Sequence, residues 1–249
     1  MDFVYIGQTL LFWLLPIIIA ITLHEAAHAW MADLCGDNTA RMLGRVSFNP
    51  IKHVHPIGTL LLPGILLVLK APILFGFAKP VPVYFNRLPR RRLGTILIAI
   101  AGPAANVVLV ILSLLLIEAI RVLVESTDLL PAWLAFWATV ILAKSILINI
   151  VLAIFNMMPL LPLDGGRILV ALLPSPLDKK LQHFELAGLA IVFGLLIGLI
   201  VIIPWIAPLF GSDFNPALHY IEPALLSVFL YIASFSSLDP SVLIELLYL

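Results

Sequence analysis

Two histidines four residues apart are the first feature of this sequence whose side chains could do chemistry. The segment Thr22–Trp30 contains His24, Glu25 and His28 in a His-Glu-x-x-His pattern. Residues four apart lie on nearly the same face of an α-helix, so both imidazoles can bind one divalent cation. The glutamate between them can then act as general base toward a water molecule that the cation polarises. The pattern therefore predicts a hydrolytic metal site on a helix.

The helix that carries these histidines belongs to a strongly apolar chain. Of its 249 residues 62% are hydrophobic and 11% are charged, and its mean hydropathy is +1.14. Soluble domains are about half apolar and about a quarter charged, and apolar runs of about 20 residues are typical of membrane-spanning helices rather than barrel strands. We therefore expect an all-α integral membrane protein. Its zero formal net charge gives no reason to expect a nucleic-acid partner, and its single cysteine excludes an intrachain disulfide.

The chain is predicted to be a single membrane-embedded domain, residues 1–249, with a polytopic helical bundle of about five spans. A three-helix metalloprotease-like core is expected at about Phe3–Leu34, Leu93–Ile120 and Ala132–Met158, so the catalytic part covers about residues 3–168. Additional C-terminal spans are expected within about 184–236, one at 184–203 and one at 216–236. The tail from Ser237 to Leu249 is expected to lie along the bundle or the interface.

The segment between the first two predicted spans carries nine of the chain's 14 basic residues. They are Arg41, Arg45, Lys52, Lys70, Lys79, Arg87, Arg90, Arg91 and Arg92. Positive charge next to spans marks the cytoplasmic side, so we expect the chain to begin outside and the histidines to lie near the cytoplasmic face. Residues 57–77 are apolar but interrupted by proline and glycine, which favours a re-entrant or β-hairpin-like cytoplasmic insertion over a crossing. Arg41–Phe48 has mixed, strand-like character, and Lys79–Val83 is expected to be extended.

A catalytic zinc site usually has three protein ligands, so a third ligand is expected at the depth of the histidines. Asp164 is the best candidate, because it follows a helix-breaking turn, is on the same side by topology, and needs a partner at membrane depth. An alternative role for Asp164 is to cap a helix that starts near Gly165. Cys35 and Glu185 are weaker candidates because both lie beyond predicted helix ends. The remaining histidines are expected in a packed or solvated loop or at the interface: His53, His55, His183 and His219.

With two later motifs, the histidine pair makes the sequence resemble the site-2 proteases, the intramembrane zinc metalloproteases of peptidase family M50. The three motifs occur in order: His24-Glu25-Ala26-Ala27-His28, then Gly102-Pro103-Ala104-Ala105-Asn106, then Asn156-Met157-Met158-Pro159 leading to Leu163-Asp164-Gly165-Gly166. Arg45–Pro50 and Phe75–Pro82 also resemble the short bacterial branch of this family, which lacks PDZ and CBS domains. The combination is specific, whereas each motif alone is not.

The resemblance implies that His24, His28 and Asp164 bind one Zn²⁺ per chain and that Glu25 is the catalytic base. It also implies that Asn156 lies near the metal, where it would bind the substrate backbone or steady the oxyanion. The expected substrates are single-pass or other membrane proteins in the lipid bilayer of the plasma membrane, cleaved in or near their transmembrane segments. The interrupted element at 57–77 and the extended stretch Lys79–Val83 could offer a strand edge to an unwound substrate.

Two other functions would use the same residues. A metal-binding membrane transporter could use the histidines and Asp164 as a transit site, and a catalytically silent scaffold could retain the fold alone. Glu25 separates hydrolysis from transport, because hydrolysis needs a base whereas a transit site could tolerate Glu25→Gln.

Overall fold

The computed structural model describes residues 3–68, 77–127, 129–174, 176–177, 188, 190–192, 194–195, 198, 202–210, 215, 219–220, 222–234 and 239–248. Its α-helices within these residues are α1 (Phe3–Leu34), α2 (Thr39–Met42), α3 (Leu62–Val68), α4 (Arg91–Ser126), α5 (Ala132–Asn156), α6 (Asp164–Leu172), α9 (Ile203–Ile206), α10 (Glu222–Ala233) and α11 (Pro240–Tyr248). None of the described residues is in a β-strand. The prediction of an all-α membrane protein is confirmed.

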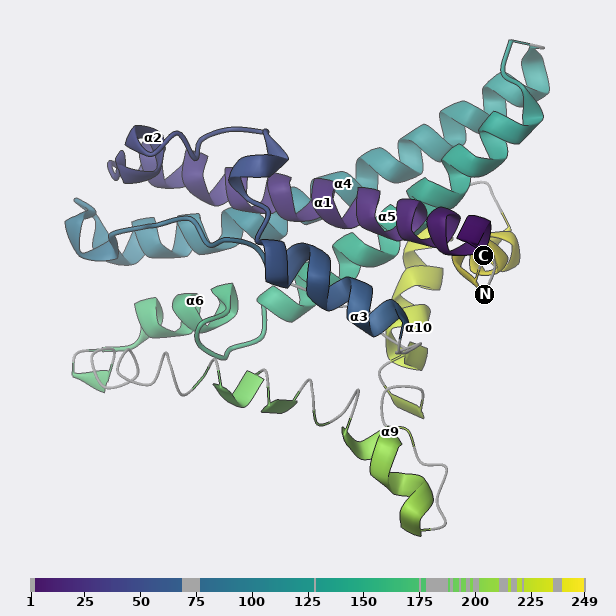
Figure 1. Ribbon diagram of the computed structural model, residues 1–249. Coiled ribbons are helices and arrows are strands. Elements are labelled where there is room, and N and C mark those ends of the chain that lie inside the picture. The colour runs from purple at the N-terminus through teal and green to yellow at the C-terminus, as the bar shows by residue number, and fades with distance from the viewer. Residues whose placement is uncertain are drawn as a thin grey trace.

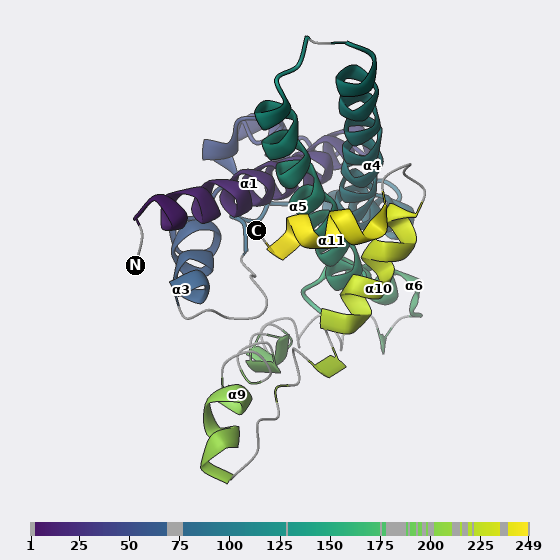
Figure 2. The same cartoon turned by 90° about the vertical axis from the view of Figure 1, so that its right-hand side faces the viewer.

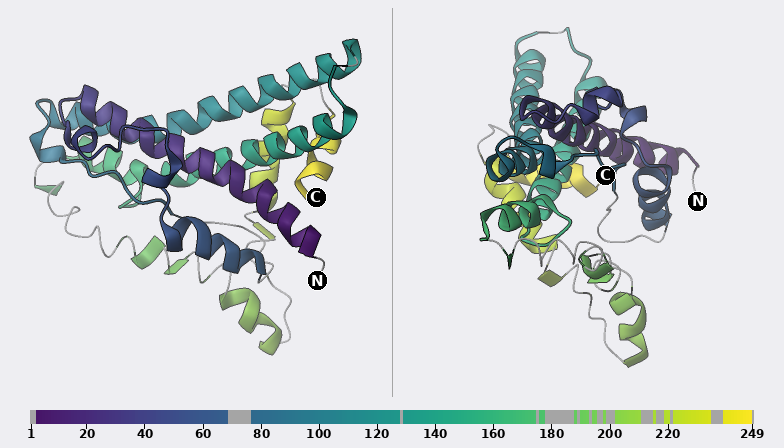
Figure 3. Two further views of the ribbon diagram at one scale, coloured as in Figure 1. Left: turned by 45° about the horizontal axis from the view of Figure 1, so that its top comes forward. Right: turned by 90° about the vertical axis from the view of Figure 1, so that its left-hand side faces the viewer.

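Three helices, α1, α4 and α5, form the centre of the molecule (Figure 1). Their apolar stretches Phe12–Leu34, Arg91–Ser126 and Ala132–Asn156 have 23, 36 and 25 residues, so each is long and apolar enough to cross a membrane. The predicted three-helix core is therefore confirmed, and α1 has the predicted bounds. Helices α4 and α5 form a hairpin whose closed end projects beyond α1 (Figure 3). The open end of the hairpin meets the C-terminal half of α1.

A buried apolar cluster joins α1 and the C-terminal helices to this hairpin. Its members are Phe12, Val110, Ile117, Val140, Ala143, Ile146, Ile150, Phe229, Leu243 and Leu247. Helix α11 lies across α5 with α10 beside it (Figure 2). Lys144 is buried in the same region, where its Nζ donates to the carbonyl oxygen of Leu247 at 3.3 Å and lies 4.5 Å from the centre of the Trp13 ring. The charge of Lys144 is therefore stabilised by a carbonyl dipole and an aromatic face.

The two predicted C-terminal spans have different outcomes. Most of residues 184–203 lies outside the described part of the chain, so the span expected there stays a prediction. Within 216–236, helix α10 has 12 residues. At 1.5 Å per residue that is about 18 Å, shorter than a hydrocarbon core of about 30 Å, so α10 by itself is not a full crossing. Helix α11 packs along the bundle, as expected of the tail.

The segment between α1 and α4 is helical or irregular where it is described, not a β-hairpin. A π-helical turn at Pro56–Leu61 continues directly into α3. The strand-like character expected for Arg41–Phe48 is wrong, because α2 occupies Thr39–Met42. The Asp37 carboxylate accepts hydrogen bonds from the backbone N–H and the hydroxyl of Thr39 and so starts this turn, and Gly44, with a φ of 64°, follows its end.

Candidate metal centre

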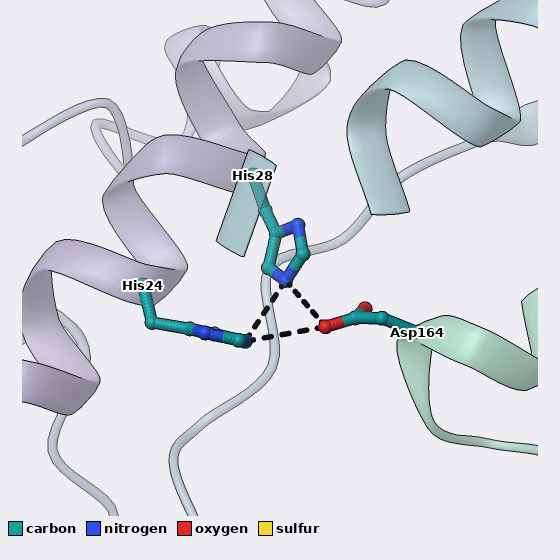
Figure 4. Close-up of side chains that lie close together, drawn as sticks. All are labelled: His24, His28 and Asp164. Atoms are coloured by element: carbon teal, nitrogen blue, oxygen red, sulfur yellow. Dashed lines mark hydrogen bonds and ion pairs between the residues drawn. The ribbon is translucent and has the colours of Figure 1, made fainter. Parts of the chain in front are cut away.

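Three buried side chains converge between α1 and α6. His24 and His28 project from adjacent turns of α1 toward Asp164, the first residue of α6 (Figure 4). The Nε2 atoms of the two histidines lie 3.0 Å apart. Asp164 Oδ2 lies 3.4 Å from Nε2 of His24 and 3.3 Å from Nε2 of His28. The structure thus brings together the three residues that were predicted as ligands.

The chemistry of these three atoms suits a cation. Nδ1 of His28 lies 2.7 Å from the carbonyl oxygen of Ile98, which can only accept, so Nδ1 carries the proton and Nε2 of the neutral ring presents a lone pair. Asp164 Oδ2 is buried and receives no hydrogen bond from the described part of the chain. Burying such electron-pair donors together is costly unless a cation lies among them. Two imidazoles and a carboxylate are a known zinc ligand set that leaves a position for water, so these residues fit zinc.

Asp164 is presented by the turn that precedes α6. The N-cap of this helix is Leu163, and the Asp164 carboxylate faces the histidines, so the alternative role of Asp164 as a helix cap is wrong. Oδ2 lies within 3.4 Å of both Nε2 atoms, so the carboxylate can share one cation with the two rings.

The Gly102–Asn106 motif of α4 packs directly against the histidines. A Cβ atom at Gly102 would clash with ring atoms of both His24 and His28, so glycine is required for α4 to approach this closely. One turn later, Asn106 Oδ1 lies 2.7 Å from His24 Nδ1. The polar partner that a buried amide needs at this depth is thus the imidazole of a predicted ligand.

Glu25 contacts the irregular segment Phe77–Tyr84. Its Oε2 accepts a hydrogen bond of 3.0 Å from the backbone N–H of Val81. This contact fixes one carboxylate oxygen of Glu25 beside the histidine pair, as expected of a base that must act next to the metal. A loop 56 positions away in sequence therefore orients the proposed base.

Arg45 anchors the same loop. Its Nη2 donates to the carbonyl oxygens of Lys79 and Pro80, and the N–H of Lys79 donates to the carbonyl oxygen of His53 at 2.9 Å. Arg45 is buried; burial lowers the pKa of its guanidinium, and the charge of Glu25 raises it. The guanidinium stays protonated because its ordinary pKa is so high. Arg45 thus holds the two residues that precede the amide bound by Glu25.

The other candidate residues lie elsewhere. Asn156 is the last residue of α5, and its Nδ2 donates to the carbonyl oxygen of Leu152 at 2.9 Å, so its contact with substrate stays a prediction. Cys35 packs against the buried cluster of Ala32, Leu88 and Ile98 rather than at the site. His53 is buried, and its Nε2 hydrogen-bonds the carbonyl oxygen of Ser47. The Nδ1 atom of His55 accepts from the backbone N–H of Gly58, and Nδ1 of His219 hydrogen-bonds the carbonyl oxygen of Asn215. His183 and Glu185 lie outside the described residues.

Residue-by-residue reasoning on the sequence missed Arg45 and Asn149. Asn149 is fully buried in the middle of α5 and accepts a hydrogen bond from Asn106. A polar amide within an apolar span is itself a signal of a partner, and that signal could have identified Asn149. Arg45 had no comparable signal, because basic residues are common throughout the loop.

Converging imidazoles and a carboxylate beside a glutamate, set among helices long enough to cross a membrane, fit a metal-dependent hydrolase. A profile of Peptidase family M50 matches residues 131–201. A Bacillus subtilis protein named "Putative zinc metalloprotease YwhC" is 33% identical over 233 residues, which cover 91% of this chain and 95% of that protein. "Putative zinc metalloprotease Rip2" of Mycobacterium tuberculosis is 28% identical over 179 residues, covering 71% of this chain and 64% of that protein. No solved structure matches significantly.

The chain belongs to peptidase family M50. It is a zinc metalloendopeptidase and a membrane protein, as the resemblance in the sequence implied.

Proposed function

We propose that the chain is an intramembrane endopeptidase that hydrolyses peptide bonds in or near transmembrane segments of membrane proteins. His24, His28 and Asp164 hold one Zn²⁺ per chain, Glu25 is the base, and the substrate is a single-pass or other protein of the same bilayer. The observation that carries this proposal is the depth of the site on α1. His24 lies ten residues before the end of this apolar helix, which is about 15 Å along its axis, so a peptide bond must come to membrane depth to be cleaved.

The plasma membrane is the proposed location, with the site near the cytoplasmic face. The end of α1, the start of α4 and the start of α6 lie at one end of the bundle (Figure 1, left). Arg41, Arg45 and the Arg90–Arg92 cluster belong to the chain segments at this end. Positive charge gathered at one end of a membrane bundle favours the cytoplasmic side.

Each side chain has a distinct task in the proposed reaction. Zinc, when bound, supplies Lewis-acid polarisation of water and of the scissile carbonyl. The Val81 amide holds one carboxylate oxygen of Glu25, so the other oxygen takes the proton from water and later gives it to the leaving amine. Asn156, at the end of α5, binds the substrate backbone in this proposal.

A transmembrane substrate must unwind locally, because helical hydrogen bonds occupy its backbone groups. The proposed docking edge is the Phe77–Tyr84 segment, and its own hydrogen bonds limit how it can pair. The N–H groups of Phe77, Lys79 and Val81 donate to Gly58, His53 and Glu25 respectively. Pro80 and Pro82 have no N–H, which leaves the Val83 N–H to donate to a substrate strand, while the strand's own amides would donate to carbonyl oxygens on this segment.

Proline substitution tests this docking edge. Val81→Pro would also remove the partner of Glu25, so Val83→Pro is the cleaner variant. We expect Val83→Pro to raise KM for a model substrate while zinc content stays unchanged. Cleavage by Val83→Pro at the wild-type rate and KM would count against the edge.

The experiment that tests the function is reconstitution in lipid vesicles with a panel of single-pass substrates. Wild type is compared with Glu25→Gln and with Glu125→Gln, a control that changes an exposed carboxylate on α4 paired with Arg121. We expect wild type and the control to cleave within the apolar segment, as located by mass spectrometry, and Glu25→Gln to fail. Bound zinc without any cleavage that depends on Glu25 would instead favour the transporter or the silent scaffold.

A further inference from the structure

A chain of buried hydrogen bonds runs from His24 into the middle of α5. His24 Nδ1 lies 2.7 Å from Oδ1 of Asn106, and Asn106 Nδ2 donates to Oδ1 of Asn149 at 2.8 Å. Asn149 Nδ2 then donates to the carbonyl oxygen of Ser145, one turn earlier on α5, also at 2.8 Å. Both asparagines have no solvent exposure. Water therefore cannot replace a link of this chain, and each group depends on its neighbour.

The last link fixes the direction of every other link. A backbone carbonyl oxygen only accepts, so the Asn149 atom that faces Ser145 must be the amide nitrogen. Oδ1 of Asn149 must then face Asn106 and accept from its Nδ2, which leaves Oδ1 of Asn106 facing His24. An amide oxygen also only accepts, so Nδ1 of His24 must carry the proton. The Nε2 atom of the neutral ring is left with its lone pair toward Asp164 and His28.

The two histidines thus reach the same tautomer in different ways. His28 Nδ1 donates directly to the carbonyl oxygen of Ile98, and no side chain intervenes. His24 has an amide as its partner, and an amide that is free to turn could offer its nitrogen as easily as its oxygen. Only the position of the Asn149 oxygen prevents Asn106 from turning.

We propose that Asn149 is a positioning residue of the metal site, which acts through Asn106 to hold His24 as the Nδ1–H tautomer with Nε2 free to bind zinc. The proposal rests on the ligation of zinc by His24 put forward above. Residues that support a metal ligand in this way typically contribute about 10- to 100-fold in metal affinity or activity. The hydrogen bonds of Asn149 go to Asn106 and Ser145 rather than to a proposed metal ligand, so its effect should be seen first in the imidazole.

The tautomer can be measured without zinc and without substrate. The metal-free full-length protein is labelled with ¹⁵N-histidine, and the His24 resonances are assigned by their loss in His24→Gln. We expect a proton on Nδ1 of His24 in wild type, and a loss of this proton from part of the population in Asn149→Leu. A wild-type His24 without a proton on Nδ1 would overturn the proposal whether or not the protein cleaves anything.

Zinc affinity provides the second measurement, by chelator competition on the purified full chain. We expect Asn149→Leu to bind zinc about 10- to 100-fold more weakly. Asn149→Thr should recover part of the affinity, because a helical threonine hydroxyl can donate to the carbonyl four residues back while accepting from Asn106. Wild-type affinity in a folded Asn149→Leu protein would also overturn the proposal.

Ser113 supplies the matched control. It is also buried, and its hydroxyl donates to that of Ser145 at 3.1 Å, which in turn lies 3.3 Å from Asn149 Nδ2, so Ser113 is next to the chain but bonds neither asparagine. A hydroxyl can rotate to donate or accept, so it does not set the direction of the amides. Ser113→Ala should keep the wild-type tautomer and zinc affinity. An equal loss in Ser113→Ala and Asn149→Leu would mean general loosening of the core and would refute the specific role. If wild type itself bound no zinc, the proposed function would fail, and the tautomer measurement would still decide this inference.

Discussion

The metal ligands and the proposed base are neighbours on one helix, yet different parts of the molecule hold them. The imidazoles of His24 and His28 are fixed by α4, through Asn106 and the carbonyl of Ile98. Glu25 is fixed by the loop before α4, through the amide of Val81. The two histidine ligands are therefore held by long helices within the apolar bundle, and the base by a segment without regular secondary structure.

Because different segments hold the ligands and the base, zinc binding and proton transfer can be lost separately. Helices packed along their whole length hold a ligand firmly, because many contacts must change before one ring moves. The loop depends on a few polar contacts, such as those of Arg45 with two carbonyl oxygens, and each of them matters more. Changes on the ligand side should remove zinc and activity together, and changes on the base side should lower activity alone.

The largest effect is expected from Asp164→Ala on the ligand side. Two imidazoles remain, without the carboxylate that completes the set and balances the cation, so zinc content and cleavage should both fall below detection. Elemental analysis of the purified protein and a vesicle cleavage assay measure the two. Asp239→Ala changes an exposed aspartate and should leave both unchanged. Stoichiometric zinc in Asp164→Ala would exclude this residue as a ligand.

Glu25→Gln is expected to have a nearly equal effect on cleavage and none on zinc. The amide keeps an oxygen that can accept from Val81, but it cannot take a proton from water, and a general base typically contributes about 10²- to 10⁴-fold in rate. Turnover with a fluorogenic transmembrane substrate and zinc content in the same preparation test the separation. Loss of zinc in this variant would show that the two sides are not independent.

Arg45→Lys should have an intermediate effect. Lysine keeps the charge, but its shorter side chain ends in a compact ammonium and does not reproduce the planar guanidinium whose Nη2 atom donates to the carbonyls of both Lys79 and Pro80. The Val81 amide then loses its fixed position, and we expect kcat/KM to fall by about 10-fold while zinc content is retained. Arg41→Lys is the control, because Arg41 is exposed and pairs with Asp33 on the surface. Equal losses in both variants would show that the protein is sensitive to any arginine replacement in this region, and would contradict a specific role of Arg45 in anchoring the loop.

The smallest effect is expected from Asp37→Asn, which weakens the other anchor of the loop. The Asp37 carboxylate accepts from the backbone N–H of Tyr84 at 2.6 Å as well as from Thr39. Burial raises the pKa of Asp37, but these hydrogen bonds lower it by more. Asp37 therefore stabilises the fold above its unfolded-state pKa of about 4, and this stability is lost as the pH falls through the lower folded-state pKa.

Thermal unfolding measured between about pH 3 and about pH 7, a range that brackets the ordinary carboxyl pKa of about 4, tests this contribution. At neutral pH the free energy of unfolding of wild type should exceed that of Asp37→Asn by about 1 kcal/mol. This difference in stability should disappear at the acidic end of the range. An advantage that persists undiminished at the acidic end would show that the charge of Asp37 is not what matters.

The ligand side could be predicted from the sequence, and the base side only in part. Four-residue spacing fixes the face of a helix, and counting apolar segments brings Asp164 to the same end of the bundle, so local pattern and topology suffice for His24, His28 and Asp164. The link from Arg45 to Lys79 and that from Glu25 to Val81 join residues 34 and 56 positions apart, and no periodic pattern encodes them. The strand-like reading of Arg41–Phe48 failed because the end of α2 and a turn at Gly44, with a positive φ, occupy the start of this segment.

Gly102 has a consequence for how freely the sequence can vary. Any side chain at this position meets the rings of both histidines, so every one of the 19 other residues is excluded for the same reason, alanine included. At Gly64 an added Cβ would meet nothing within 4 Å. In a library of all single substitutions selected for cleavage, position 102 should retain glycine alone while position 64 accepts many residues. The pattern of tolerated substitutions would then identify the position of the metal site through Gly102, a residue that has no side chain.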